Sequence, residues 1–289
     1  MSEAPTPTPA RDASPPGAAL EAELNDQWYF AERSANLAAG AQFRMLSMGQ
    51  PVVIGRTRLG EVFALRDICP HRLVQLSAGR QIDTNGQPTL ECPYHGWRFD
   101  TSGTCRLMPS LTDDDPTDPT RVKVRNYPVR EQHGAIFVYI AETSRSGGIP
   151  DSDPPDLGRL SDTPKQIFKQ PVDLPMNAAV KVYCGAGQPP LLPTHWTWHP
   201  LASEGRQSSR FKRFFGPVIS SESNIVAPGF RWESIASRQA RLVTLTCLTP
   251  IDANTTQVTG LAWRMGAPLM NWMISPGTPA GIDANQMTV

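Results

Sequence analysis

Two short segments, each with a cysteine and a histidine, constrain this chain more than any other feature of its sequence. CPH at 69–71 is followed, after twenty residues, by CPYH at 92–95. Proline favours a tight loop in each segment, so the cysteine and histidine of a pair can face the same point. Thiolates and imidazoles are side chains that bind transition metals. We therefore expect one metal centre with the ligands Cys69, His71, Cys92 and His95.

Two kinds of metal centre fit this set of ligands. A structural zinc ion takes two thiolates and two imidazoles around a single point. A [2Fe–2S] cluster takes the thiolates on one iron and the imidazoles on the other, which removes negative charge and raises the reduction potential of the cluster. In the second case both histidines can place their outer ring nitrogen at the surface, where an electron partner approaches.

The sequence around the ligands resembles one family. The two segments read CPHRLVQLSAGR (69–80) and CPYHGWRFDTSGTC (92–105). They resemble the Rieske domain of the Rieske non-haem iron oxygenases. The cluster Trp28-Tyr29-Phe30 resembles in particular the α subunits of the homotrimeric branch, which includes aromatic-ring hydroxylases, O-demethylases and pheophorbide-oxygenase-like proteins. The resemblance covers roughly residues 28–140. It implies that the centre is a [2Fe–2S] cluster, that Trp97 packs beside it, and that Gly96 lets the backbone approach a sulfur.

The same resemblance implies a second site, a mononuclear Fe(II) held by two histidines and one carboxylate. The segment LLPTHWTWHPLAS (191–203) supplies His195 and His199, and Asp283 is the candidate for the carboxylate. Four residues apart, the two histidines share one face if the segment is helical. The alternative is that they bind no metal and only pack beside the neighbouring tryptophans.

This second segment departs from the family pattern at several points. The two histidines are one residue closer together than in the family. The aspartate that links the cluster to the neighbouring iron falls at Leu192 or Gly187, and neither side chain can hydrogen-bond an imidazole. The third iron ligand is expected near Val289, where the sequence stops. We therefore expect a degenerate or shortened catalytic domain.

The predicted fold is α+β, with an all-β Rieske [2Fe–2S] domain followed by an incomplete helix-grip domain, an antiparallel sheet with helices. A tail rich in Pro, Ala and Thr is expected to be disordered, and a segment rich in Gly, Pro, Ser and Asp is expected to link the domains. The boundaries are 1–24 for the tail, 25–142 for the Rieske domain, 143–166 for the linker and 167–289 for the helix-grip domain. Strands are predicted at 51–58, 61–67, 89–93, 97–100, 121–126, 135–140, 209–216, 224–235, 240–249 and 256–265.

Composition excludes several other classes of function. Lys and Arg together number 27, as do Asp and Glu, and this balance favours neither nucleic acid nor an anionic membrane. No apolar run approaches the roughly 20 residues that span a bilayer, and no secretory signal is present, so we expect a cytoplasmic protein. Five scattered cysteines are typical of metal ligands and buried thiols rather than disulfides. Cys105 is expected to be a buried thiol.

Two hypotheses for function follow. The first is a terminal oxygenase component, a homotrimer that uses O2 to hydroxylate or demethylate an aromatic or hydrophobic small molecule. It receives electrons from a flavin/iron–sulfur reductase or a ferredoxin, and NAD(P)H serves it only through that partner. The second is a catalytically inactive Rieske electron-transfer or structural subunit, favoured by the departures at the mononuclear site.

Overall fold

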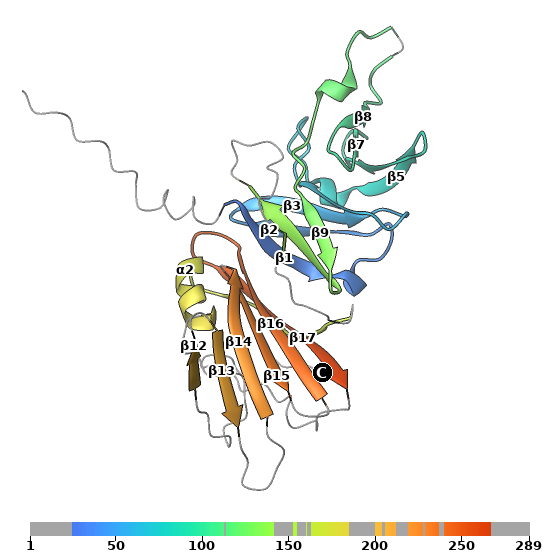
Figure 1. The fold of residues 1–289 in the computed structure, drawn as a ribbon. Helices are drawn as coiled ribbons and strands as arrows, with labels where there is room; N and C mark the ends of the chain where they lie inside the picture. Colours follow the sequence, from blue (N-terminus) through green and yellow to red (C-terminus); the bar gives the residue numbers. More distant parts are fainter. Residues whose placement is uncertain are drawn as a thin grey trace, which may run out of the picture.

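The chain forms two β-rich units (Figure 1), as the predicted fold class required. The computed structural model describes residues 25–112, 114–141, 153–154, 160, 163–184, 200–203, 206–211, 219–227, 229–236 and 240–266. The predicted tail and most of the predicted linker lie outside these residues. So does part of the predicted strand at 209–216.

The first unit consists of three small antiparallel sheets, with strand orders β1-β10-β9, β2-β3-β4 and β5-β6-β7-β8. Their strands are β1 (Gln27–Arg33), β2 (Gln42–Ser47), β3 (Gln50–Arg56), β4 (Val62–Arg66), β5 (Arg80–Thr84), β6 (Gln87–Glu91), β7 (Arg98–Asp100), β8 (Cys105–Leu107), β9 (Val129–Gln132) and β10 (Ala135–Ile140). Single helical turns lie between them at η1 (Ser34–Asn36), η2 (Leu76–Ala78) and η3 (Pro119–Arg121). In Figure 1 the β5–β8 sheet lies farthest from the second unit.

Turn residues set the register of these sheets. Asn85 and Gly86 have φ of 54° and 78°, as a two-residue hairpin loop with matching right-handed twist requires. Gly60, with φ of 94°, turns the chain between β3 and β4. The strands predicted at 51–58 and 61–67 correspond to β3 and β4. The predicted strand at 121–126 is wrong, because this segment contributes only isolated bridges, Leu65 with Asn126 and Thr104 with Lys123.

The second unit is a seven-stranded antiparallel sheet in the order β11-β17-β16-β15-β14-β13-β12. Its strands are β11 (Lys165–Val172), β12 (Pro200–Ser203), β13 (Arg206–Phe211), β14 (Ile219–Ala227), β15 (Phe230–Ala236), β16 (Ala240–Pro250) and β17 (Thr256–Gly266). The short helix α2 (Met176–Ala179) continues directly into η4 (Val180–Cys184), and both contact the sheet at β16. The prediction of a second antiparallel sheet is confirmed.

The two units share an apolar junction. Aromatic side chains of β1 and β10 pack against those of β15 and β17; the buried aromatic residues at this contact are Trp28, Phe30, Phe137, Tyr139, Phe230 and Trp263. Side chains of the second unit donate hydrogen bonds to backbone carbonyls of the first unit at this contact. The indole Nε1 of Trp263 donates to the carbonyl of His133 at 3.1 Å, and Thr249 Oγ1 donates to the carbonyl of Phe30 at 3.1 Å. His133 therefore serves the junction through its backbone, in a turn where its φ is 51°.

No helix in the part of the chain that the structure describes is both long enough and apolar enough to cross a lipid bilayer.

Candidate metal centre

The first candidate loop follows β4 and runs into η2. Its turn is closed by two backbone hydrogen bonds, from Cys69 N to the carbonyl of Val74 at 2.8 Å and from Leu73 N to the carbonyl of Cys69 at 2.9 Å. Leu73 adopts a positive φ of 57°, which an L residue rarely does. The loop is thereby narrow enough to keep Cys69 at its base and His71 at its tip.

The second candidate loop joins β6 to β7 and is closed in a similar way. Cys92 N donates to the carbonyl of Trp97 at 2.8 Å, and Gly96 N donates to the carbonyl of Cys92 at 3.1 Å. Gly96 has a φ of 69°, and a Cβ atom there would lie 3.2 Å from the ring of Pro109. The positive φ favours glycine at this position, and a larger residue would also crowd Pro109.

The two thiols lie together inside the first unit. Cys69 is 1% exposed and Cys92 3%, among apolar side chains of β4, β6 and β7. Burial raises the pKa of the Cys69 thiol to about 11, and the neighbouring Cys92 thiol contributes to the rise. The Cys69 thiol would remain protonated, unless a bound cation stabilised its thiolate.

The two imidazoles lie together at the surface. The ring centroids of His71 and His95 are 4.7 Å apart, and both side chains are exposed. Trp97 stacks on His71 with a centroid distance of 4.7 Å and an interplanar angle of 3°. Loss of hydration, followed by the charges of His95 and Arg72, lowers the pKa of His71. The neutral ring, which is the form that binds metals, is therefore favoured.

A buried carboxylate anchors the first loop. Asp67, whose side chain is fully buried, accepts hydrogen bonds from Ser77 N and Ser77 Oγ, both at 2.6 Å. The Nε of Arg44 lies 3.4 Å from the same carboxylate. Asp67 thus connects the end of β4 to η2 across the loop that carries Cys69 and His71.

A close approach of backbone joins the bases of the two loops. A Cβ atom at Gly79 would lie 1.9 Å from the carbonyl oxygen of Glu91, which immediately precedes Cys92. Glu91 in turn accepts hydrogen bonds from the Nε atoms of Arg80, at 3.0 Å, and Arg98, at 2.8 Å. Strands β5, β6 and β7 are held together where the second loop begins.

A hydrogen-bond network supports the far side of the second loop. One oxygen of Asp100 accepts from Ser102 N, Ser102 Oγ and Thr104 N at 2.6–3.0 Å, and the other accepts from Arg106 Nε at 2.6 Å. Burial alone would raise the pKa of Asp100, but these bonds outweigh it and the pKa is lowered. Cys105, predicted to be a buried thiol, is fully buried beside this network.

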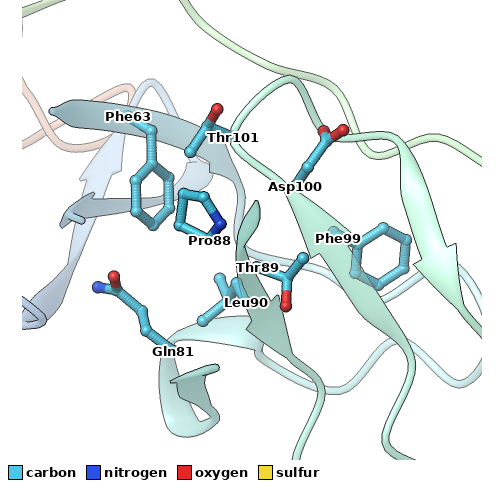
Figure 2. Close-up of a pocket in the computed structure, with 8 residues that line it drawn as sticks. All are labelled: Phe63, Gln81, Pro88, Thr89, Leu90, Phe99, Asp100 and Thr101. Carbon is cyan, nitrogen blue, oxygen red and sulfur yellow. The ribbon is translucent and has the colours of Figure 1, made fainter. Parts of the chain in front are cut away.

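Neither described cavity near the first unit offers a ligand site. Figure 2 shows a crevice between Phe63 of β4 and residues of the β5–β8 sheet, and its volume is about 0 Å³. A second cavity, of about 190 Å³, lies at the junction of the two units and is lined by Arg44 and Lys169. Both cations are neutralised there, because Lys169 lies 2.9 Å from Glu32 and Arg44 faces Asp67.

The four predicted ligands from the first unit are thus brought together as a thiol pair and an imidazole pair. Within the described ranges, no three His, Cys, Asp or Glu side chains converge as ligands of a single ion. His195, His199 and Asp283, predicted for a mononuclear iron, lie outside the described residues. Sequence reasoning missed Asp67 and Gly79; a charged residue directly after the apolar strand at 62–66 was the available signal for Asp67.

Comparison with known proteins agrees with this geometry. Residues 27–128 match the family model of the Rieske [2Fe-2S] domain, so this part of the chain is a Rieske domain. Relatives include the oxygenase subunit of 3-chlorobenzoate-3,4-dioxygenase from Comamonas testosteroni, 37% identical over 40% of this chain and 26% of that protein. The 4beta-methylsterol monooxygenase of Methylococcus capsulatus is 33% identical over 43% of this chain and 32% of that protein.

These relatives confirm the predicted resemblance to α subunits of Rieske non-haem iron oxygenases. The matched segment spans less than a third of the length of the two relatives described. The crystal structure of dicamba monooxygenase has the same fold over more of the chain, with a TM-score of 0.63 at 22% identity, covering 83% of this chain and 76% of that one. The likeness of fold therefore extends into the second unit.

Proposed function

We propose that this chain is the terminal oxygenase component of a Rieske-type system, an oxidoreductase that hydroxylates or demethylates an aromatic or hydrophobic small molecule. In such a reaction one oxygen atom of O2 enters a C–H bond, and two electrons and two protons reduce the other to water. Electrons would come from NAD(P)H through a separate reductase or ferredoxin. We place the electron-transfer domain at 25–142 and the catalytic domain at 167–289, joined by a linker at 143–166.

The observation that carries the proposal is the separation of ligand types at the metal centre. A thiol pair is buried and an imidazole pair is exposed, which suits a cluster whose two irons each take two protein ligands. Cys69 and Cys92 would hold one iron, and His71 and His95 the other. The bound cluster supplies one-electron transfer. The chain keeps water from the thiolates and fixes the first imidazole by stacking it on Trp97.

The placement of the centre also supports a multimer. The β5–β8 sheet, between whose strands the second loop lies, points away from the second unit of the same chain (Figure 1). An electron leaving the exposed histidines would reach another molecule more directly than its own second unit. This favours the homotrimer that the family resemblance implies, with the mononuclear iron of the neighbouring subunit as acceptor.

Metal and sulfide content, together with electron paramagnetic resonance, test the proposal. Chain produced with abundant iron should be coloured and, after reduction, should show a signal with an average g near 1.9, and Cys92→Ser should abolish both. Three irons per chain would support the oxygenase, whose mononuclear ligands we propose as His195, His199 and Asp283. Two irons per chain, with no product from a panel of aromatic substrates, would favour an electron-transfer or structural subunit. Zinc without sulfide would refute both.

A further inference from the structure

The tips of the two metal loops expose large apolar side chains. Within the described residues the exposed large apolar side chains are those of Leu59, Leu73, Tyr94 and Val182. Leu73 is 75% exposed and follows His71 by two residues. Tyr94 is 61% exposed and directly precedes His95, with the two ring centroids 3.9 Å apart. We call Leu73, Tyr94 and the two exposed histidines the apolar tip.

The backbone conformation of Leu73 is unfavourable for a leucine. Its φ of 57° crowds the Cβ atom, although Leu73 N donates to the carbonyl of Cys69 in this conformation. A glycine would adopt the same turn without strain, and a polar side chain would be better hydrated at this exposure. The turn and the solubility of a single chain therefore do not explain a leucine here. A partner that covers the side chain would explain it.

The apolar tip carries little charge. Arg72 is the one charged residue in the segments 69–79 and 92–97. Charge steers transient electron-transfer encounters, which bury little area, whereas the core of a lasting interface is depleted of charged residues. The composition of the tip therefore favours a second copy of this chain over a transient electron donor as the covering partner.

The second unit has an exposed apolar residue that could receive the tip. Val182 of η4 is 44% exposed, and the neighbouring Tyr183 is half-buried. The segment 173–184 contains one acid and one base, Asp173 and Lys181, and both are exposed. Their charges cancel, so the segment has no net charge that would repel Arg72 of another copy.

Within one chain these two sites lie on different units. The second metal loop joins β6 to β7 in the β5–β8 sheet, which lies farthest from the second unit (Figure 1). The η4 turn belongs to the second unit, where it contacts β15 and β16. Two copies arranged head to tail would bring the two sites together, and such a contact gives a closed ring when its rotation closes.

We infer that the apolar tip of one copy packs against Val182 of the next copy, so that the second unit of a neighbour covers the two imidazoles. This inference rests on the proposed function, because the proposed homotrimer is the assembly in which the contact would form. Burial of Leu73 and Tyr94 supplies the driving force, since both side chains leave water. The strained leucine is then compensated in the assembly and not in the single chain.

Sedimentation velocity of the full chain, loaded with its cluster, tests this contact. The unaltered chain should form a closed trimer. Leu73→Lys and Val182→Glu should each raise the dissociation constant at least about tenfold, because each buries an unpaired charge. The two substitutions together should recover most of this loss, since a lysine of one copy then meets a glutamate of the next. Visible absorbance per chain checks that every variant still folds around its cluster.

Leu59→Lys is the matched control. It makes the same change at a residue that is 85% exposed, in the turn at the opposite end of β4 from the first metal loop, and the dissociation constant should not change. A monomeric unaltered chain, unchanged assembly of either single variant, or a double variant no better than the single ones would overturn the inference.

Two further measurements separate this inference from other roles of the same surface. Unchanged assembly of Leu73→Lys, with slower reduction of its cluster by a reduced plant-type ferredoxin, would assign the apolar tip to an electron donor and overturn the inference. A trimer whose variants behave as expected but which hydroxylates nothing would retain the inference and refute the proposed oxygenase. Hydroxylation by a chain that stays monomeric would do the reverse.

Discussion

The two loops of the metal centre present the same kinds of ligand but are anchored by different means. Asp67, at the first loop, is sealed from solvent and holds Ser77, ten residues further along the chain. Asp100, after the second loop, retains 10% side-chain exposure and holds only its own turn, from Ser102 to Arg106. The first loop therefore depends on long-range packing, and the second on a local turn. We therefore expect added side-chain volume to destabilise the first loop. We expect a fall in pH to destabilise the second loop.

The largest expected loss of stability follows from a substitution at the base of the first loop. Gly79→Ala places a methyl group on the carbonyl oxygen of Glu91 and should lower the free energy of unfolding by about 3 kcal/mol or more, because backbone must move. Gly86→Ala, in open space at a positive φ, is the control and should cost about 1 kcal/mol. Urea unfolding measures both. Equal losses would mean that the close approach does not hold the loops together.

A smaller effect is expected from Asp67→Ala. It leaves the N–H and hydroxyl of Ser77 without their acceptor in a buried place, at a cost of about 2–3 kcal/mol. The variant should also bind the cluster less tightly, which the visible absorbance per chain would show. Asp67→Asn keeps one acceptor oxygen, so its free energy of unfolding should fall less than that of Asp67→Ala. If Asp67→Ala is as stable as the unaltered chain, the first loop is anchored by other contacts.

The smallest effect, and the one that depends on pH, is expected at Asp100. Its pKa is lowered in the folded state, so the charged form contributes stability above the ordinary pKa of about 4, and this is lost as pH falls through the lowered folded value. Asp100→Asn should cost about 1 kcal/mol at pH 7, a modest value because Arg106 is 40% exposed. Unfolding measured from pH 7 down to pH 3 should show this difference shrinking. A difference that stays constant with pH would contradict the assigned role.

The metal centre was predictable from sequence because its ligands are adjacent in the chain. Each Cys–His pair lies within one loop, and residues 69–80 and 92–105 include the glycines that the loops require. The hairpins at Gly60 and Gly86 were predictable for the same reason, since a turn is a local property. The strand predicted at 121–126 failed because alternating apolar residues there serve packing, while their backbone pairs only at isolated bridges.

The surroundings of the buried ion pair between Arg231 and Glu233 were not predictable from the sequence. Only the register of β15 and β16 places Arg231 beside Thr246. Read along the chain, Thr244 and Thr246 are ordinary strand residues with a high β-propensity. Asp67 and Ser77 present the same difficulty, because a contact across ten residues carries no local pattern. Sequence therefore revealed the ligands of the candidate metal centre and left the contacts that hold its loops hidden.

The order of residues within each metal loop has a consequence for direction. In both loops the cysteine comes first, close to the preceding strand, and the histidine follows two or three positions later toward the tip. The order of residues along the chain thus places both thiols on the buried side of the centre and both imidazoles on its exposed side. Exchanging the two residue types in both loops would keep all four donors while pointing sulfur at solvent, and the site would be open to oxidation where it now offers nitrogen.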